Sequence, residues 1–118
     1  MQLRMNSRVK DDVLILDCIG RIVFGEESAA LRDAVKSALT GNPNVLLNLA
    51  EVNYIDSGGL GILVSLYTTA HNAGGALKLA CLTQRVGDLL QVTKLLTIFE
   101  VFDNEQAAVN SFQKGMAA

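Results

Sequence analysis

Aromatic residues are scarce in this chain. They make up 5% of its 118 residues, whereas half of the residues are hydrophobic. A chain of this length buries about two-thirds of the surface that it exposes when unfolded, so it can form a real core. That core has to be built from Leu, Val, Ile and Ala at helix and strand spacing. The composition therefore favours layers of helices and strands, an α/β fold.

Positive charge is also limited. The net charge is −2, and no cluster of Lys or Arg is longer than a pair. Proteins that bind nucleic acid need a basic surface, so neither DNA nor RNA is an expected partner. Apolar runs such as residues 13–16 are far too short to cross a bilayer, and residues 1–6 lack the pattern of a signal peptide. We therefore expect a cytoplasmic protein with no membrane span.

Cysteine and histidine are too few to form a metal site. Cys18 and Cys81 each lie in an apolar, strand-like run, where a thiol behaves as a small hydrophobe, so both are expected to be buried and reduced. His71 is the only histidine. Without a His pair or closely spaced cysteines no metal ligand set is available. The glycines also lack the Gly-Lys-Ser/Thr ending of a Walker loop, and no cofactor is expected.

Hydrophobic periodicity predicts the element order β-β-α-β-α-β-α-β-α. We expect strands at 3–9, 13–19, 45–49, 77–82 and 98–102, a turn at Gly20, a loop at 50–55, and helices at 26–40, 57–72, 84–92 and after Asp103. Because helices alternate with strands, the sheet should be mostly parallel, with only the first strand antiparallel at an edge. Thr83 is a candidate N-cap, and Asp103 with Gln106 resembles a capping box. One domain spanning residues 1–118 accounts for the whole pattern.

The segment that carries chemistry is residues 53–62, which read Asn-Tyr-Ile-Asp-Ser-Gly-Gly-Leu-Gly-Ile. It opens the second predicted helix, and a helix start presents free backbone N–H groups and the positive end of the helix dipole. Ser57 is placed to be the N-cap or a first-turn residue. Three glycines in this helix, Gly58, Gly59 and Gly61, are unfavourable, because each lowers helix stability by up to about 1 kcal/mol relative to Ala. Either Ser57 merely caps the helix and the glycines allow a tight turn, or the bare backbone serves another purpose.

A helical wheel divides this helix into two faces. The larger side chains share one face, which should pack on the sheet: Leu60, Leu63, Val64, Tyr67 and His71. Small side chains form a second, smooth stripe that another protein could approach closely: Gly58, Gly61, Ser65 and Thr68. A phosphate on Ser57 would add a charge of about −1.5 to −2 beside Asp56 and fill the space that a partner needs. The helix dipole tolerates such a phosphate, so binding should be lost while the fold stays intact.

At these residues the chain resembles the STAS family, named for sulfate transporters and anti-sigma-factor antagonists. The resemblance rests on the strand order, on Leu47-Asn48-Leu49, and on the signature that runs from Tyr54 through Asp56 and Ser57 to Gly61. In stand-alone bacterial members, it implies that a partner anti-sigma factor with serine kinase activity phosphorylates the serine after the aspartate. The unphosphorylated form binds that kinase and releases the sigma factor, and a serine phosphatase resets the cycle. By position, Ser57 is the implied phosphoacceptor.

Two departures from the family pattern bear on the partner. Members often read Asp-Ser-Ser-Gly-Leu-Gly, whereas Gly58 replaces the second serine here and leaves Ser57 as the acceptor. Residues 20–25 also differ from the usual Gly-x-Leu-Asp pattern, and that loop should border the surface around Ser57. We therefore expect one partner-binding surface, formed by Asp56, Gly58, Gly59, Gly61, Ser65, Arg21, Phe24 and Gly25.

Two other functions compete for the same residues. Residues 56–59 match the sequence around the nucleophile of chymotrypsin-like proteases. His71 should lie several turns further along the same helix, too far for proton transfer, so an enzyme is not expected. A STAS module of another assembly, such as a lipid-transport machine or a larger signalling complex, stays open as the alternative. Reversible phosphorylation would play no part there, and Ser57 would be only a cap.

Overall fold

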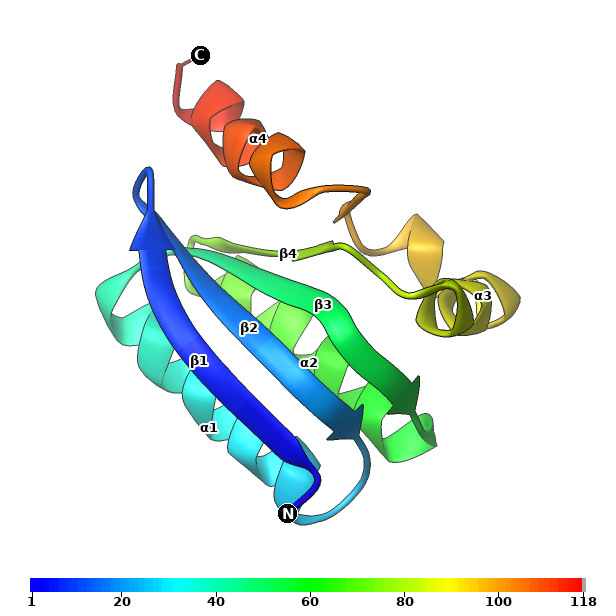
Figure 1. Cartoon of the computed structure of the whole chain (residues 1–118). Coiled ribbons are helices and arrows are strands. Elements are labelled where there is room, and N and C mark those ends of the chain that lie inside the picture. Colours follow the sequence, from blue (N-terminus) through cyan, green and yellow to red (C-terminus); the bar gives the residue numbers. More distant parts are fainter. Residues whose placement is uncertain (118) are drawn as a thin grey trace.

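The computed structural model describes the backbone of residues 1–117 and the side chains of residues 1–113. Five strands form one mixed sheet in the order β1-β2-β3-β4-β5 (Figure 1): β1 (Leu3–Lys10), β2 (Val13–Ile22), β3 (Asn44–Ile55), β4 (Ala76–Ala80) and β5 (Val101–Phe102). β1 is antiparallel to β2, and every other neighbouring pair is parallel. The predicted α/β domain with one antiparallel edge strand is confirmed.

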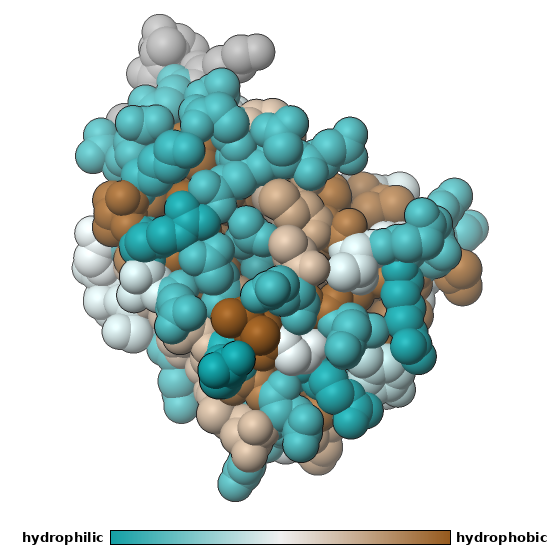
Figure 2. Space-filling view, viewed as in Figure 1, coloured by the Kyte–Doolittle hydropathy of each residue, from teal (hydrophilic) through white to brown (hydrophobic). Residues whose placement is uncertain are grey.

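The helices cover the two faces of this sheet unequally. They are α1 (Glu26–Gly41), α2 (Ser57–Asn72), α3 (Gln84–Val92), the short 3-10 helix η1 (Leu95–Thr97) and α4 (Glu105–Ala117). α1 and α2 lie behind the sheet in Figure 1, where they enclose the larger core. α4 covers one end of the opposite face, over a smaller core formed by Val13, Ile15, Leu46, Ala80, Ala108, Val109 and Phe112. Hydrophilic residues dominate much of the remaining surface in Figure 2.

An ion-pair cluster joins the start of α4 to the sheet. The Arg8 guanidinium donates to the Asp17 carboxylate, with 2.7 Å between Nε and Oδ2, and to the Glu105 carboxylate. Glu105 also accepts a hydrogen bond of 3.0 Å from the Asn48 amide. Side chains from β1, β2 and β3 thus hold the first turn of α4. No helix within residues 1–117 is long and apolar enough to cross a membrane.

The two central strands run further than predicted. β3 continues through residues 50–55, predicted as a loop, and Gly20, predicted as a turn, lies inside β2. Backbone pairing between the strands extends to Ile22 and Ile55, past register shifts that absorb the irregular stretch. Both strands therefore end side by side, immediately before Asp56.

α2 packs on the sheet with a face different from the predicted one. Its buried residues are Gly59, Leu63, Leu66 and Ala70. Of the predicted face, only Leu63 is fully buried, and His71 is exposed. The small residues Gly59 and Ala70 let the helix approach the strands closely. Tyr67 is half-buried and meets the Phe99 ring edge-on, with centroids 5.4 Å apart.

The C-terminal third departs from prediction in three places. β4 ends at Ala80, because Cys81 takes a left-handed φ of 62°, and Cys81 is half-buried rather than buried. β5 keeps only the last two residues of the predicted strand, because η1 and Ile98 occupy the chain before it. Asn104 rather than Asp103 caps α4, since its Oδ1 accepts a 2.8 Å hydrogen bond from the Ala107 N–H.

Candidate functional site

The predicted site lies where β3 passes into α2, at the carboxyl end of the parallel strands. Asp56 is the single residue between the two elements, and its backbone is extended, with φ −94° and ψ −177°. Ser57 is the first residue of α2. In parallel α/β sheets, the carboxyl ends of the strands form the edge where loops and helix N-termini meet, and ligand sites concentrate there.

Asp56, not Ser57, is the N-cap of α2. Its Oδ1 accepts a 2.8 Å hydrogen bond from the Gly59 N–H, and both carboxylate oxygens lie 3.1 Å from the backbone nitrogen of Phe24. These N–H groups, Gly59 first and then Phe24, favour the ionised carboxylate and hold the pKa of Asp56 below its ordinary value. One side chain thus joins the start of α2 to the loop that follows β2.

Because Asp56 caps α2, the side chain of Ser57 is not needed to cap the helix. Its side chain is exposed, and no hydrogen bond to its hydroxyl occurs among the described residues. Loss of a helix N-cap lowers the stability of a protein by about 1 kcal/mol. Ser57 is not the cap, so a change at its side chain does not carry this cost. A group attached to its Oγ can therefore be accommodated without breaking a bond that holds the fold.

The three glycines of the motif differ in what surrounds them. A Cβ on Gly59 would lie 2.1 Å from the Ile22 carbonyl oxygen, so glycine is required for α2 to meet the end of β2. A Cβ on Gly58 would lie 2.5 Å from the Cβ of Phe24. Gly61 has open space around it. Two of the glycines are thus explained by close packing, and Gly61 belongs to an exposed surface.

Gly61 continues into the smooth stripe that the sequence predicts on α2. Ser65 and Thr68 are exposed along it, whereas Gly58 is partly covered. The hydroxyl of Thr68 bonds back to the Val64 carbonyl within the helix. The stripe therefore presents a surface with few projecting side chains beside Ser57.

The loop between β2 and α1 borders Asp56, as the sequence predicts. Phe24 follows the end of β2, donates its N–H to Asp56, and is 81% exposed. Gly25 precedes α1 with a φ of 116° that favours glycine, and its N–H donates to the Ser28 hydroxyl. Arg21 lies at the end of β2, with its guanidinium carbon 4.9 Å from the centre of the Tyr54 ring.

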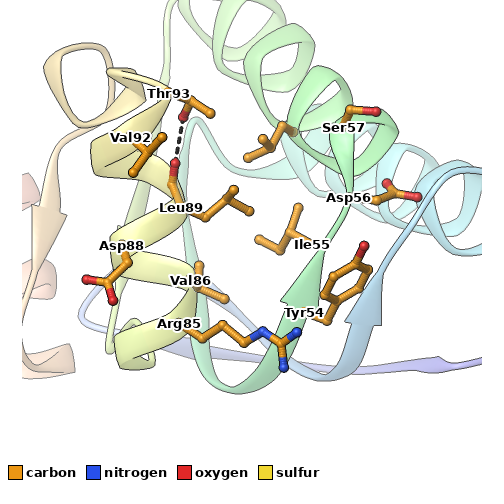
Figure 3. Close-up of a pocket in the computed structure, with 11 residues that line it drawn as sticks. Tyr54, Ile55, Asp56, Ser57, Arg85, Val86, Asp88, Leu89, Val92 and Thr93 are labelled. Carbon is orange, nitrogen blue, oxygen red and sulfur yellow. Dashed lines mark hydrogen bonds between the residues drawn. The ribbon is translucent and has the colours of Figure 1, made fainter.

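A pocket of about 640 Å³ opens on the other side of Ser57, between the start of α2 and α3 (Figure 3). Its walls are mainly apolar, and Ile55, Val86 and Leu89 point into it. The full lining is Tyr54, Ile55, Asp56, Ser57, Leu60, Arg85, Val86, Asp88, Leu89, Val92 and Thr93. The sequence did not reveal this pocket, because its α3 wall meets β3 only in the folded chain.

Two arginine side chains lie over the ring of Tyr54, which lines the pocket. The Arg85 guanidinium lies 5.4 Å from the centre of the ring, and Arg21 approaches the same ring at 4.9 Å. Contacts of this kind contribute about 0.5–1 kcal/mol each at exposed sites. Neither guanidinium has a carboxylate within 4.0 Å in the described part of the chain. Both cations can meet an acidic surface, while Arg21 also acts at longer range on Asp56 and Glu27 and adds to the backbone hydrogen bonds that lower the pKa of each carboxyl.

The arrangement offers Ser57 no activating base. His71 stands fourteen positions further along α2, which at 1.5 Å per residue is roughly 21 Å. A catalytic base must come within hydrogen-bond distance of its nucleophile, so a protease-like pair does not form. Across the described residues, no group of three His, Cys, Asp or Glu side chains is placed to hold a metal ion.

Comparison with known proteins identifies the family. The model of the STAS domain matches residues 4–108, which is most of the chain. The chain belongs to the STAS domain family. Among the relatives of this STAS chain, a Bordetella bronchiseptica protein named as a candidate anti-sigma factor antagonist is 25% identical over 117 residues, 98% of each chain. The anti-sigma-B factor antagonist of Bacillus subtilis is 29% identical over 79 residues, 67% of this chain and 72% of that protein.

Solved STAS structures share the fold. The crystal structure of a candidate anti-sigma factor antagonist from Thermotoga maritima matches with a TM-score of 0.81 at 24% identity, covering 92% of this chain and 94% of that one. The anti-sigma factor antagonist SpoIIAA matches in its unphosphorylated form with a TM-score of 0.74, covering 95% and 96%. Bacillus SpoIIAA in its phosphorylated form matches with a TM-score of 0.69, covering 92% and 97%; both are 14% identical.

Proposed function

We propose that this STAS chain is an anti-sigma factor antagonist that works in the cytoplasm. While Ser57 is unmodified, the chain binds an anti-sigma factor that is itself a serine kinase, and the sigma factor is released. The kinase then transfers the γ-phosphate of ATP to the Ser57 oxygen, the hydroxyl proton is lost, ADP leaves, and binding ends. A serine phosphatase hydrolyses the phosphoserine and restores the first state.

The observation that carries this proposal is the division of labour between Asp56 and Ser57. Asp56 caps α2, whereas Ser57 presents an exposed hydroxyl outside the cap. A kinase can reach such a hydroxyl without unfolding its substrate. The names of the B. subtilis relative and of SpoIIAA, both anti-sigma factor antagonists, support the same role.

Electrostatics explain how a phosphate would end binding. The group adds about −1.5 to −2 charge directly beside the Asp56 carboxylate, whose low pKa keeps it ionised at neutral pH. It also occupies the rim between the pocket and the smooth stripe of α2. A like charge in an interface costs several kcal/mol, and the bulk blocks close approach. SpoIIAA has the STAS fold in both its unphosphorylated and phosphorylated forms, so this fold can carry the modification intact.

The proposed partner-binding surface is centred on Ser57. It contains the predicted residues Arg21, Phe24, Gly25, Asp56, Gly58, Gly59, Gly61 and Ser65, together with the pocket beyond Ser57. Gly59 is buried and contributes through packing rather than direct contact. The exposed members surround the hydroxyl on two sides, so one docking event would cover the stripe and bring Ser57 to the kinase.

The first experiment is intact-mass analysis and peptide mapping of the chain isolated from its native cells. The proposal expects one phosphate on Ser57 in a fraction of the molecules. Absence of that phosphate in every growth condition would favour a STAS subunit that works without reversible phosphorylation.

A second experiment uses purified anti-sigma factor kinases from the same cells. Ser57→Asp should weaken binding while Ser57→Ala preserves it and removes phosphorylation. Ser37→Asp is the matched control, because Ser37 is an exposed serine on α1 away from this surface. Gly61→Leu should block docking by bulk without disturbing the fold, since Gly61 faces open space. Wild-type affinity for Ser57→Asp would contradict the proposal.

A further inference from the structure

Phe24 and Val92 are the most exposed large hydrophobic residues of the described chain, at 81% and 80%. Isolated apolar residues on a surface are common, so exposure alone carries no meaning. The position of Phe24 is informative, because this residue is hydrogen-bonded to Asp56, the cap of α2, and packs against Gly58. The ring is free while the backbone under it is held.

The backbone of the Phe24 loop is fixed on both sides. Its own N–H donates to both oxygens of Asp56 at 3.1 Å. The Gly25 N–H donates to the Ser28 hydroxyl, and the Ser28 N–H donates to the Val23 carbonyl at 3.0 Å. A projecting ring on a fixed backbone loses little conformational entropy when it binds. Aromatic residues, Phe among them, are enriched in protein–protein interfaces relative to the rest of the surface.

Gly58 packs directly against Phe24 and leaves no room for a side chain at residue 58. A Cβ at residue 58 would lie 2.5 Å from the Phe24 Cβ and 3.1 Å from its Cα, closer than non-bonded carbons approach. Any side chain larger than hydrogen at residue 58 would therefore displace Phe24. The glycine at residue 58 and the position of Phe24 are therefore coupled by direct contact.

The positive charge over the Tyr54 ring, two residues before Asp56, indicates what a partner would present. Arg21 and Arg85 lie over the Tyr54 ring, and no carboxylate of the described chain lies within 4.0 Å of either guanidinium. A partner that covers both features needs an apolar hollow for the ring and acidic side chains for the cations. Such complementarity determines partner choice and association rate.

We propose that Phe24 is the anchor by which this chain selects its partner, inserting its ring into an apolar hollow flanked by acidic residues that face Arg21 and Arg85. The inference rests on the proposed function, because the partner is taken to be an anti-sigma factor. Gly58 keeps Phe24 in the binding position. Partner selection is thereby separated from the phosphorylation switch, which acts through Ser57.

The binding test compares purified anti-sigma factor kinases from the same cells against wild type and variants by calorimetry. Phe24→Ala should weaken binding about 30-fold, the scale typical of an aromatic anchor, and Phe24→Tyr should restore most of it. Val9→Ala is the control, since Val9 is 65% exposed and lies at the far end of β1. Arg21→Gln with Arg85→Gln should weaken binding and reduce its dependence on salt.

The outcomes separate the two proposals. Wild-type affinity for Phe24→Ala, with wild type itself binding a kinase, overturns the anchor and leaves the proposed function standing. A wild-type chain that binds none of the anti-sigma factor kinases overturns the proposed function, and with it the partner assigned to Phe24.

An experiment without any partner tests the contact between Gly58 and Phe24. Gly58→Ala should lower the thermal midpoint of the wild-type chain, and the same change should have a much smaller effect beside Phe24→Gly, which removes the clashing Cβ. Gly61→Ala, in the same helix with open space around it, should not lower the midpoint. Equal losses for Gly58→Ala in both backgrounds would show that residues 24 and 58 are independent, which overturns the coupling.

Discussion

Replacing Asp56 by alanine removes the carboxylate that accepts from the N–H groups of Gly59 and Phe24. Loss of an N-cap costs about 1 kcal/mol, and loss of the hydrogen bond from Phe24 to a charged but partly exposed acceptor costs about 1 kcal/mol more. The free energy of unfolding should therefore fall by about 2 kcal/mol. For a chain of this size that lowers the thermal midpoint by about 8 °C.

Ser57→Ala provides the comparison in the adjacent position. Its hydroxyl has no hydrogen bond among the described residues, so its loss should change the free energy of unfolding by less than about 0.5 kcal/mol. Asp56→Asn keeps a capping oxygen and should fall between the two. Urea unfolding followed by circular dichroism measures all three, with unchanged m-values as the check for two-state behaviour. If Ser57→Ala costs as much as Asp56→Ala, the assignment of the cap is wrong.

Three further predictions concern stability and reactivity. The lowered pKa of Asp56 means that its contribution is present above the ordinary carboxyl value of about 4 and is lost as pH falls through the folded-state pKa, so the difference in midpoint between wild type and Asp56→Asn should shrink in acid. Gly59→Ala should destabilise by at least about 2 kcal/mol in urea, because its Cβ meets the Ile22 carbonyl at 2.1 Å, whereas Gly61→Ala should be neutral or stabilising. Burial raises the pKa of Cys18 to about 12, so a thiol reagent at pH 8 should label it only upon unfolding; rapid labelling of the native chain would contradict its burial.

Local chemistry in the sequence was sufficient for much of the fold. Thr83 caps α3 as predicted, since its hydroxyl accepts from the Val86 N–H, and α2 has the predicted bounds. Alternation of helices and strands predicted the mostly parallel pairing with one antiparallel edge strand, which the structure confirms. Residues 50–55 were predicted as a loop between the third strand and the second helix. Pairing with the end of β2 makes that segment a strand, and this contact is not local.

The site was predictable in outline but not in its division of roles. Asp56 and Ser57 are both good N-cap residues, so the sequence could not decide between them. The structure decides through the Phe24 loop, which needs the carboxylate as its acceptor. The pocket was missed because Leu89 belongs to α3, far along the chain from the motif. The strand at residues 50–55, the cap and the pocket share one cause: each depends on contacts between segments that are distant in sequence.

The most direct test of the central claim is a single titration on a defined sample. The chain is incubated with its anti-sigma factor kinase and ATP, the phosphorylated position is mapped by mass spectrometry, and the affinity for the kinase is measured before and after. We predict one phosphate on Ser57 and an affinity reduced by at least about 100-fold, as like charges in an interface require. A phosphate at another residue, or an unchanged affinity with Ser57 fully phosphorylated, would contradict the account.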